Sequence, residues 1–304
     1  MQNNRVLALG FFDGVHLGHA ALLQTAVRRA HERRAIAAAI SFDTHPDTLV
    51  YGRSVPLLNS MAEREALMRE RCGVEEVVFV HFDRAMMDMP WETFVTDYLL
   101  HTLHACHLVC GHDFRFGRRG EGSAEKLLAL CRDLGVGCDI IGEVCMDGGV
   151  VSSTRIRALL QKGECAQAVR LLGHGQLLSG EVRHGAHRGT GLGFPTANLA
   201  FSPGILVPAF GVYCAQAELD GKRLPALVNI GVHPTLGALP QPVLEAHLPG
   251  FSGNLYGKTL RIWLLTHLRG EMRFDSPAAL RQQLQHDLAA CMDFLGAAPG
   301  RMTP

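Results

Sequence analysis

RVLALGFFDGVHLGH, residues 5–19, is the stretch of sequence that decides the fold of the first half of the chain. Its apolar run from Arg5 to Phe12 predicts a strand, and the Gly and Asp residues at its end predict a loop. Apolar side chains then recur on one face of the segment from His19 to Arg33, which predicts a helix: Leu22, Leu23, Ala26 and Ala30. We therefore expect a β-loop-α unit here.

The same alternation continues through the first half. Further apolar strands are predicted at 36–42, 77–82, 108–110 and 138–141, with helices between them at 61–71, 92–103 and 124–134. Strands that alternate with helices form a parallel sheet covered on both faces. The sequence therefore predicts an α/β domain of the Rossmann-like type.

The pattern of predicted elements changes after two short predicted helices, at 156–161 and 164–172. Short strands separated by Gly, Pro and Asn then follow at 211–219, 226–230 and 259–265, which favours an antiparallel barrel or sandwich. Ser276 and Pro277 predict the start of a final helix that packs on the barrel through Leu280, Leu284, Leu288 and Met292. The 304 residues are expected to form two domains, 1–174 and 175–304.

Composition limits the possible functions. The 29 Lys+Arg and 29 Asp+Glu residues cancel, so no overall charge favours nucleic acid or an anionic membrane. The apolar run at Val6–Phe12 is too short for a signal peptide, and a cytoplasmic protein, monomeric or weakly homo-oligomeric, is expected. Nine cysteines, none separated from another by only two residues, suggest reduced core residues and no disulfide framework.

The loop Gly10–His19 has the features of a phosphate site. It leads from the end of a predicted strand into a helix N-terminus, where free N–H groups and the helix dipole attract an anion. His16 and His19 can donate to triphosphate oxygens, and Gly18 lets the backbone approach closely. Two surface histidines are the alternative for such a short motif.

A second anion site is predicted at 152–157, SSTRIR. Its hydroxyls, from Ser153 and Thr154, lie at a predicted helix start, and Arg157 follows one turn later. Two phosphate-binding segments in one domain favour a nucleotide-dependent enzyme over chance.

With these motifs, the first half resembles the bifunctional riboflavin kinase/FAD synthetase family of bacteria, whose N-terminal domain is an HxGH nucleotidylyltransferase. The resemblance rests on four segments: Gly10–His19, 42–46, 111–117 and 152–157. It implies that ATP phosphates are contacted by His16, His19, Ser153, Thr154 and Arg157. It also implies that His45, Asp113 and Phe116 lie near the adenylyl-transfer or flavin site. The residues of the loop that are expected to bind the cofactor are Gly10, Phe11, Asp13 and Gly18. Thr44 and Asn59 depart from the family pattern.

The segment 185–199 reads GAHRGTGLGFPTANL. Glycines, among them Gly189 and Gly191, provide a backbone able to wrap phosphates, and Thr196 and Asn198 point the same way from an extended chain. A glycine-rich hairpin is the alternative, but the run 195–198 favours a Mg-ATP site.

This segment is similar to the signature of riboflavin kinases, and the likeness continues at 229–231, 245–248 and 255–258. The resemblance implies that Thr196 and Asn198 coordinate nucleotide and Mg²⁺, and that Glu245 accepts the proton of the ribityl 5′-hydroxyl. Departures at Val232–His233, Leu236 and Pro249–Gly250 concern the flavin contacts. The chain is thus expected to convert riboflavin to FMN and FMN to FAD with ATP.

Two rival functions remain open from the sequence. One is a cytidylyltransferase for another phosphomonoester, which leaves the second half unexplained. The other is a non-catalytic flavin-binding protein, which the presence of Thr196, Asn198 and Glu245 disfavours.

Overall fold

The computed structural model describes residues 4–52, 54–185, 193–233 and 241–297. The chain divides into two compact units. The first comprises residues up to 56 together with Arg64–Ser152, and the second comprises Leu57–Glu63 together with the residues from Ser153 onward. Each unit is described by itself.

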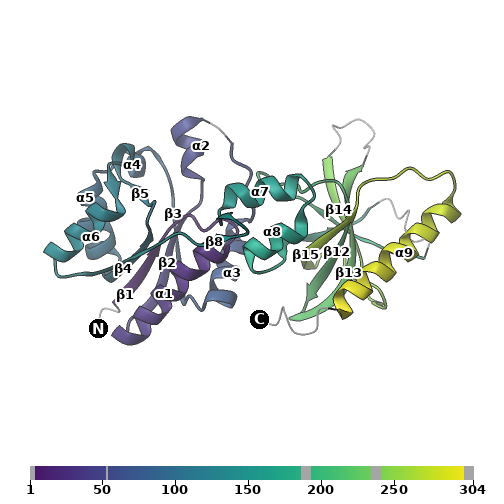
Figure 1. Cartoon of the computed structure of the whole chain (residues 1–304), viewed down its shortest axis with the longest axis horizontal. Helices are drawn as coiled ribbons and strands as arrows, with labels where there is room; N and C mark the ends of the chain where they lie inside the picture. Colours follow the sequence, from purple (N-terminus) through teal and green to yellow (C-terminus); the bar gives the residue numbers. More distant parts are fainter. Residues whose placement is uncertain (1–3, 53, 186–192, 234–240, 298–304) are drawn as a thin grey trace. The chain divides into compact units, whose positions relative to one another are not determined.

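The first unit contains a five-stranded parallel sheet in the order β3-β2-β1-β4-β7, which confirms the predicted α/β fold (Figure 1). The strands are β1 (Arg5–Leu9), β2 (Ile36–Phe42), β3 (Glu76–Val80), β4 (Ala105–Gly111) and β7 (Gly137–Ile141). The chain adds strands on one side of β1 and then on the other. Open α/β sheets bind ligands at such a reversal, outside the carboxyl ends of the strands.

Helices flank this sheet: α1 (Leu17–Arg33), α2 (Pro46–Tyr51), α3 (Met61–Cys72), α4 (Arg84–Met87), α5 (Trp91–Thr93) and α6 (Ala124–Asp133). The helix predicted at 92–103 is α5 followed by a π-helix, η1 (Phe94–Thr102), so its hydrogen bonds reach one residue further back. A 3₁₀ turn, η2 (Arg118–Gly120), and two short hairpins complete the unit: β5 (Arg115–Phe116) with β6 (Gly122–Ser123), and β8 (Cys145–Met146) with β9 (Gly149–Val150).

The second unit is a closed antiparallel barrel in the order β10-β11-β14-β13-β12-β15, so of the two predicted alternatives the barrel is confirmed. Its strands are β10 (Gln176–Arg183), β11 (Ala197–Ala200), β12 (Gly211–Leu219), β13 (Lys222–His233), β14 (Gln241–His247) and β15 (Thr259–Arg269). The helices α7 (Ser153–Gln161) and α8 (Cys165–Leu172) precede the barrel, and α8 packs on β10 and β15.

The segment Leu57–Glu63 is built into the second unit, which the sequence did not reveal. The Asn59 amide donates to the carbonyl of Leu177 at 2.9 Å, and the Gln176 amide donates to the carbonyl of Leu58 at 2.6 Å. The Glu63 carboxylate accepts from the Ser179 hydroxyl at 2.7 Å. Early sequence and the first barrel strand therefore share buried hydrogen bonds, which are costly to leave unmade.

The final helix, α9 (Pro277–Gly296), begins as predicted, because the Ser276 hydroxyl accepts from the amide of Ala279. It lies along the outside of the barrel (Figure 1), where Leu284 and Leu288 pack against buried strand residues. Met292 was expected on this face, but it is 43% exposed. An α-helix has 3.6 residues per turn, so residues spaced four apart gradually leave the buried face of the helix. Cys291 and Leu295 occupy that buried face in place of Met292.

The cysteine prediction was wrong for two of the nine residues. Cys214 of β12 and Cys291 of α9 form a disulfide, while the other seven are free thiols. Both partners are fully buried, and they lie 77 positions apart in the sequence. Their spacing gave no signal because a pairing this distant is decided by the packing of α9 on the barrel.

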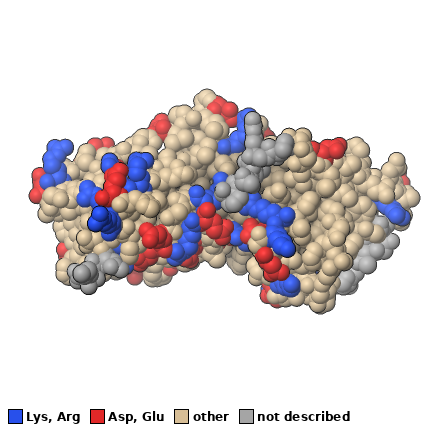
Figure 2. Space-filling model, turned by 90° about the horizontal axis from the view of Figure 1, so that it is seen from below, with Lys and Arg blue, Asp and Glu red and all other residues tan. Residues whose placement is uncertain are grey.

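The distribution of charged side chains on the surface agrees with the balanced composition. On the face seen in Figure 2, basic and acidic side chains lie interspersed. Within the described ranges, no helix combines the length and apolar character needed to cross a membrane.

The disulfide predicts a measurable thiol count. Alkylation of the unfolded, unreduced protein should label seven of the nine cysteines. Reduction should lower the melting temperature, since a cross-link over a loop of this length stabilises by roughly 4 kcal/mol in the chain-entropy model. In Cys291→Ser, the melting temperature should not respond to reductant. Labelling of all nine cysteines in the wild-type chain would contradict the pairing.

Candidate active sites

The loop after β1 has an unusual backbone. Phe12 has φ 57°, Gly14 has φ 84° and Val15 has φ 40°, so three residues within four adopt left-handed conformations. Non-glycine residues hold such angles at a cost of about 1–3 kcal/mol each, and they do so mostly at functional sites. At Gly10 a side chain would crowd the Phe12 ring, since an added Cβ would lie 3.0 Å from it. This conformation is the first sign of a site here.

His16 and His19 are brought together as predicted. His16 caps α1, and its Nδ1 accepts from the amide of His19 at 3.3 Å. The two rings stack with centroids 3.6 Å apart. Burial, with the nearby His16 ring as a smaller cause, holds the pKa of His19 well below its usual value. Both rings therefore lie at the start of a 17-residue helix, and His19 is neutral at neutral pH.

Other predicted residues surround this helix start. Asp13 is buried. Gly18 lies close to the His16 ring, since a Cβ added to Gly18 would lie 3.1 Å from that ring. His45 caps α2 and meets the Phe11 ring edge-on at 4.7 Å between centroids. The ends of β1 and β2 thus contribute to one group of residues.

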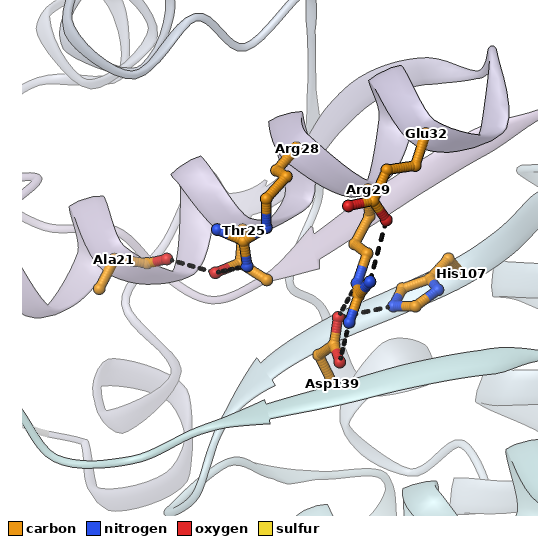
Figure 3. A network of polar contacts seen from close by, with 7 residues as sticks. All are labelled: Ala21, Thr25, Arg28, Arg29, Glu32, His107 and Asp139. Carbon is orange, nitrogen blue, oxygen red and sulfur yellow. Dashed lines mark hydrogen bonds and ion pairs between the residues drawn. The ribbon is translucent and has the colours of Figure 1, made fainter.

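The far end of α1 is fixed to the sheet by charged groups (Figure 3). Arg29 donates through Nε and Nη2 to Asp139 of β7, at 2.6 and 3.1 Å, and His107 of β4 contacts the same carboxylate at 3.0 Å. Arg29 first, and His107 to a lesser extent, lower the pKa of Asp139. These contacts set the direction of the helix whose N-terminus carries the histidine pair.

The segment 111–117 places its two predicted residues differently. Asp113 is exposed at the end of β4, whereas Phe116 is buried and stacks on Phe114 at 5.2 Å between centroids. Phe116 also contacts Trp91 and Phe94. Any role of Phe116 in binding therefore acts through the packing of its loop.

The helix α7 begins at Ser153, three residues before the predicted start, so Ser153 and Thr154 lie in its first turn. Arg157 Nη2 donates to Thr154 Oγ1 at 3.2 Å, so these two side chains lie together, and Ser153 is the first residue of the helix. This segment belongs to the second unit, whereas the histidine pair belongs to the first.

In the barrel, strand pairing brings the predicted kinase residues together. Asn198 of β11 lies opposite Glu245 of β14, and Glu245 lies opposite Asn229 of β13. Residues directly opposite in an antiparallel pair point to the same face. The row continues to Val212 of β12 and Arg269 of β15. Asn229 and Arg269 had no assigned role from the sequence.

Two pockets lie at these strands, and members of the row line the first of them. One, of about 410 Å³, lies between α9 and the strands. Its lining includes the polar residues Thr196, Asn229, Glu245 and Arg269 and the apolar residues Met272, Phe274, Leu280 and Leu284. The other, of about 390 Å³, is lined by Pro195, Phe251, Leu255, Tyr256 and, again, Thr196. Thr196 therefore has access to both pockets, and Glu245 lines the first of them.

Arg269 is held in this pocket by α9. It donates to the Asp287 carboxylate through Nε and Nη2, at 3.0 and 2.8 Å, and the Gln283 amide donates to the same group. Asp287 is 3% exposed, so the pair is shielded from water, which makes the loss of one partner costly. The pair fixes α9, and with it the apolar wall of the pocket.

Gly185 makes a close approach to the site. A Cβ at this position would overlap the carboxamide of Asn198, so the two segments meet only because residue 185 has no side chain. Gly189 and Gly191, the other predicted glycines, lie outside the described residues.

The neutral state of His19 predicts a pH-dependent stability. The folded protein resists protonation of this ring, whereas the unfolded chain takes up a proton near the ordinary pKa of 6.5. Stability of the first unit should therefore fall as the pH decreases below that value, by up to about 1.4 kcal/mol per pH unit from this group.

Urea denaturation without nucleotide, followed by hydrogen exchange in β1, measures this effect. In His19→Gln, the free energy of unfolding should decrease less steeply as the pH falls below the ordinary histidine pKa. His31→Gln, at an exposed position on the same helix, should show the same pH dependence as the wild type. Identical pH profiles for wild type and His19→Gln would contradict the buried, neutral ring.

Comparison with known proteins assigns both halves. Residues 1–155 match the family described as FAD synthetase, and residues 172–295 match the family described as riboflavin kinase. A solved protein from Streptococcus pneumoniae, described as a macrolide-efflux protein, has a similar fold. Its TM-score is 0.83 at 28% identity, with 96% of this chain and 95% of that one covered.

Curated relatives match along almost the whole length. The bifunctional riboflavin kinase/FMN adenylyltransferase of Escherichia coli K12 is 36% identical over 299 residues, which cover 97% of this chain and 94% of the relative. The enzyme of the same name from Bacillus subtilis is 32% identical, with 94% and 91% covered. The two family matches follow the predicted order, and these relatives cover more than nine tenths of this chain. The chain therefore belongs to the bifunctional riboflavin kinase/FMN adenylyltransferase family, with an FAD synthetase half followed by a riboflavin kinase half.

Proposed function

We propose that the barrel pocket phosphorylates riboflavin to FMN and that the His16/His19 loop directs the adenylylation of FMN to FAD, each with its own ATP. The observation that carries the first assignment is that Thr196 lines two pockets and Glu245 lines one of them. A phosphoryl donor in one pocket and an acceptor in the other would meet at Thr196. Phosphoryl transfer needs chiefly this alignment.

In the kinase step, the ribityl 5′-oxygen bonds to the γ-phosphorus of ATP, the bond from that phosphorus to the β,γ-bridging oxygen breaks, and ADP leaves. Glu245 accepts the hydroxyl proton. The pocket beside it has an apolar wall that suits a flavin ring: Met272, Phe274, Leu280 and Leu284. Asn229 and Arg269, in the same lining, are suited to the polar atoms of the flavin.

Thr196 and Asn198 fit a Mg²⁺ ion that arrives with ATP. Hydroxyl and carboxamide oxygens are hard ligands of the kind that Mg²⁺ prefers, and Mg²⁺ is commonly held by few protein groups together with phosphates. When bound, the ion would neutralise phosphate charge. Gly185 supports Asn198 by its close approach, and Gly189 and Gly191 are proposed to contact the phosphates.

In the adenylyl-transfer step, an oxygen of the FMN phosphate bonds to the α-phosphorus of ATP, and the bond to the leaving pyrophosphate breaks. His16 and His19 stabilise the charge at the transferring phosphate by hydrogen bonding. The neutral, buried His19 suits this role because an approaching triphosphate favours its protonated form. Amides near Gly10, which follows β1, and near Gly18, at the start of α1, support the same phosphates.

The remaining first-half residues receive the roles that the resemblance implies. Ser153, Thr154 and Arg157 are proposed to contact ATP phosphates, as hydroxyls at a helix start and a guanidinium one turn later do. The second group, proposed to line or support the nucleotide and flavin, comprises Phe11, Asp13, His45, Asp113 and Phe116.

The two functions are proposed to divide at residue 174, with the linker helices α7 and α8 counted in the adenylyltransferase part. The family matches end at residue 155 and begin again at residue 172, so they support a division between these residues, while the contacts of α7 and α8 group them with the barrel unit. A cytoplasmic location and a monomeric or weakly associated state are proposed with it.

Product analysis with purified chain, ATP and Mg²⁺ tests the assignment. Riboflavin should give FMN and then FAD, and FMN alone should give FAD with pyrophosphate. His19→Ala should lower FAD formation by at least 100-fold, on the scale of lost transition-state hydrogen bonds, with FMN formation unchanged. Glu245→Gln should do the reverse.

Three outcomes would contradict the proposal. Activity with CTP in place of ATP would favour a cytidylyltransferase, and bound flavin without turnover would favour a non-catalytic protein. Loss of both activities from either single substitution would contradict two independent sites.

Chelation of divalent cations should stop both steps if Mg²⁺ is required.

Gly185→Ala tests the support of Asn198. The new methyl group should displace the Asn198 carboxamide and lower riboflavin kinase activity by at least tenfold, a barrier change of about 1.4 kcal/mol, with FAD formation from FMN unchanged. Gly296→Ala is the matched control, because a Cβ there meets no atom within 4 Å. Equal kinase rates for the two variants would rule out the close approach as a constraint.

A further inference from the structure

Arg64 of α3 is a fully buried cation with no assigned role. It is 0% exposed, although arginine is almost never buried completely unless it is paired. Burial lowers the pKa of Arg64 to about 10, with Asp13 and Asp43 acting in the opposite direction. The guanidinium therefore remains charged at neutral pH, beneath the sheet edge that carries the histidine loop.

Its hydrogen bonds reach the ends of two neighbouring strands. Nη1 donates to the carbonyl of Phe11 at 2.9 Å and to the hydroxyl of Ser41 at 2.7 Å, and Nη2 donates to the carbonyl of Phe42 at 3.0 Å. The Ser41 hydroxyl in turn donates to the Phe11 carbonyl at 2.8 Å. The Phe11 carbonyl thus accepts two hydrogen bonds where the loop leaves β1.

The guanidinium also packs on the same residue. Its Cζ lies 4.4 Å from the centroid of the Phe11 ring and 5.3 Å from that of Phe79. A planar guanidinium can stack on a ring and bridge carbonyls at once, which an ammonium cannot do. Arg64 therefore holds both the peptide and the side chain of Phe11.

The loop needs such support, because the left-handed residues Phe12, Gly14 and Val15 follow directly. Strained backbone persists only where surrounding contacts fix it. We propose that Arg64 is a positioning residue for adenylyl transfer: by fixing Phe11 it keeps the strained loop, and so His16 and the start of α1, in the geometry that the transferring phosphate requires. This inference rests on the proposed role of the His16/His19 loop.

Arg64→Lys tests it, since lysine keeps the charge but loses the planar fork. We expect kcat for FAD formation from FMN to fall at least tenfold, KM for ATP and FMN to change less than threefold, and the riboflavin kinase rate to stay unchanged. Phe79→Leu is the matched control, because it alters packing on Arg64 at a ring outside the loop. It should lower the melting temperature with kcat for FAD formation within twofold.

Several results would overturn the proposal. One is an unchanged kcat in Arg64→Lys, and another is a kcat loss that only follows the unfolded fraction seen by circular dichroism. A third is an equal kcat loss in Phe79→Leu. If Arg64→Lys does not fold, Ser41→Ala decides the matter, because it removes one partner of both Arg64 and Phe11. It should lower kcat for FAD formation at least threefold, and full activity would reject the idea.

The proposed function is tested separately. Should His19→Ala retain wild-type FAD formation, the role assigned to the loop would fail whatever Arg64 does. A tenfold loss in Arg64→Lys beside a 100-fold loss in His19→Ala would support both. An inactive His19→Ala with a fully active Arg64→Lys would reject only the positioning role.

Discussion

The pairing of β1 between β2 and β4 is the constraint on which the first half depends. Val6, Leu7 and Ala8 are completely buried, so β1 cannot shift along its neighbours without exposing apolar surface. Its end therefore fixes where the loop to α1 starts, at the reversal of strand order. Asp139 and Arg29 fix the other end of that helix, and the histidines at its start inherit a defined position.

In the barrel, the hydrogen-bond ladder has the corresponding role. Asn198, Glu245 and Asn229 come from three strands and meet because Glu245 lies opposite both asparagines. A shift of one residue in any of these strands would turn its side chain to the other face. Catalytic geometry and fold stability therefore depend on the same register, while α9, through Asp287 and Arg269, adds the wall of the pocket.

Much of this was predictable where the signal is local. Periodicity gave the five strands of the sheet and the barrel strands β12, β13 and β15, whereas β10, β11 and β14 were not predicted. The motif glycines marked both sites. The signals that failed depend on distant packing: the buried contacts of Asn59 and Glu63 with the barrel, the Cys214–Cys291 bond, and the partners of Arg64. Met292 shows the same limit at short range, since a spacing of four follows a helix face only briefly. Asn229 had a findable signal, because the motif 229–231 was recognised but given no role.

The closure of the barrel has a consequence for synthesis on the ribosome. β10, the first barrel strand, pairs with β15, the last, so the barrel stays open until residues beyond 259 have emerged. The segment Leu57–Glu63, made much earlier, has its hydrogen-bond partners in β10 and must wait for them. Open strand edges template aggregation. Nascent chains that stall between residues 183 and 259 would thus be the form most in need of a chaperone.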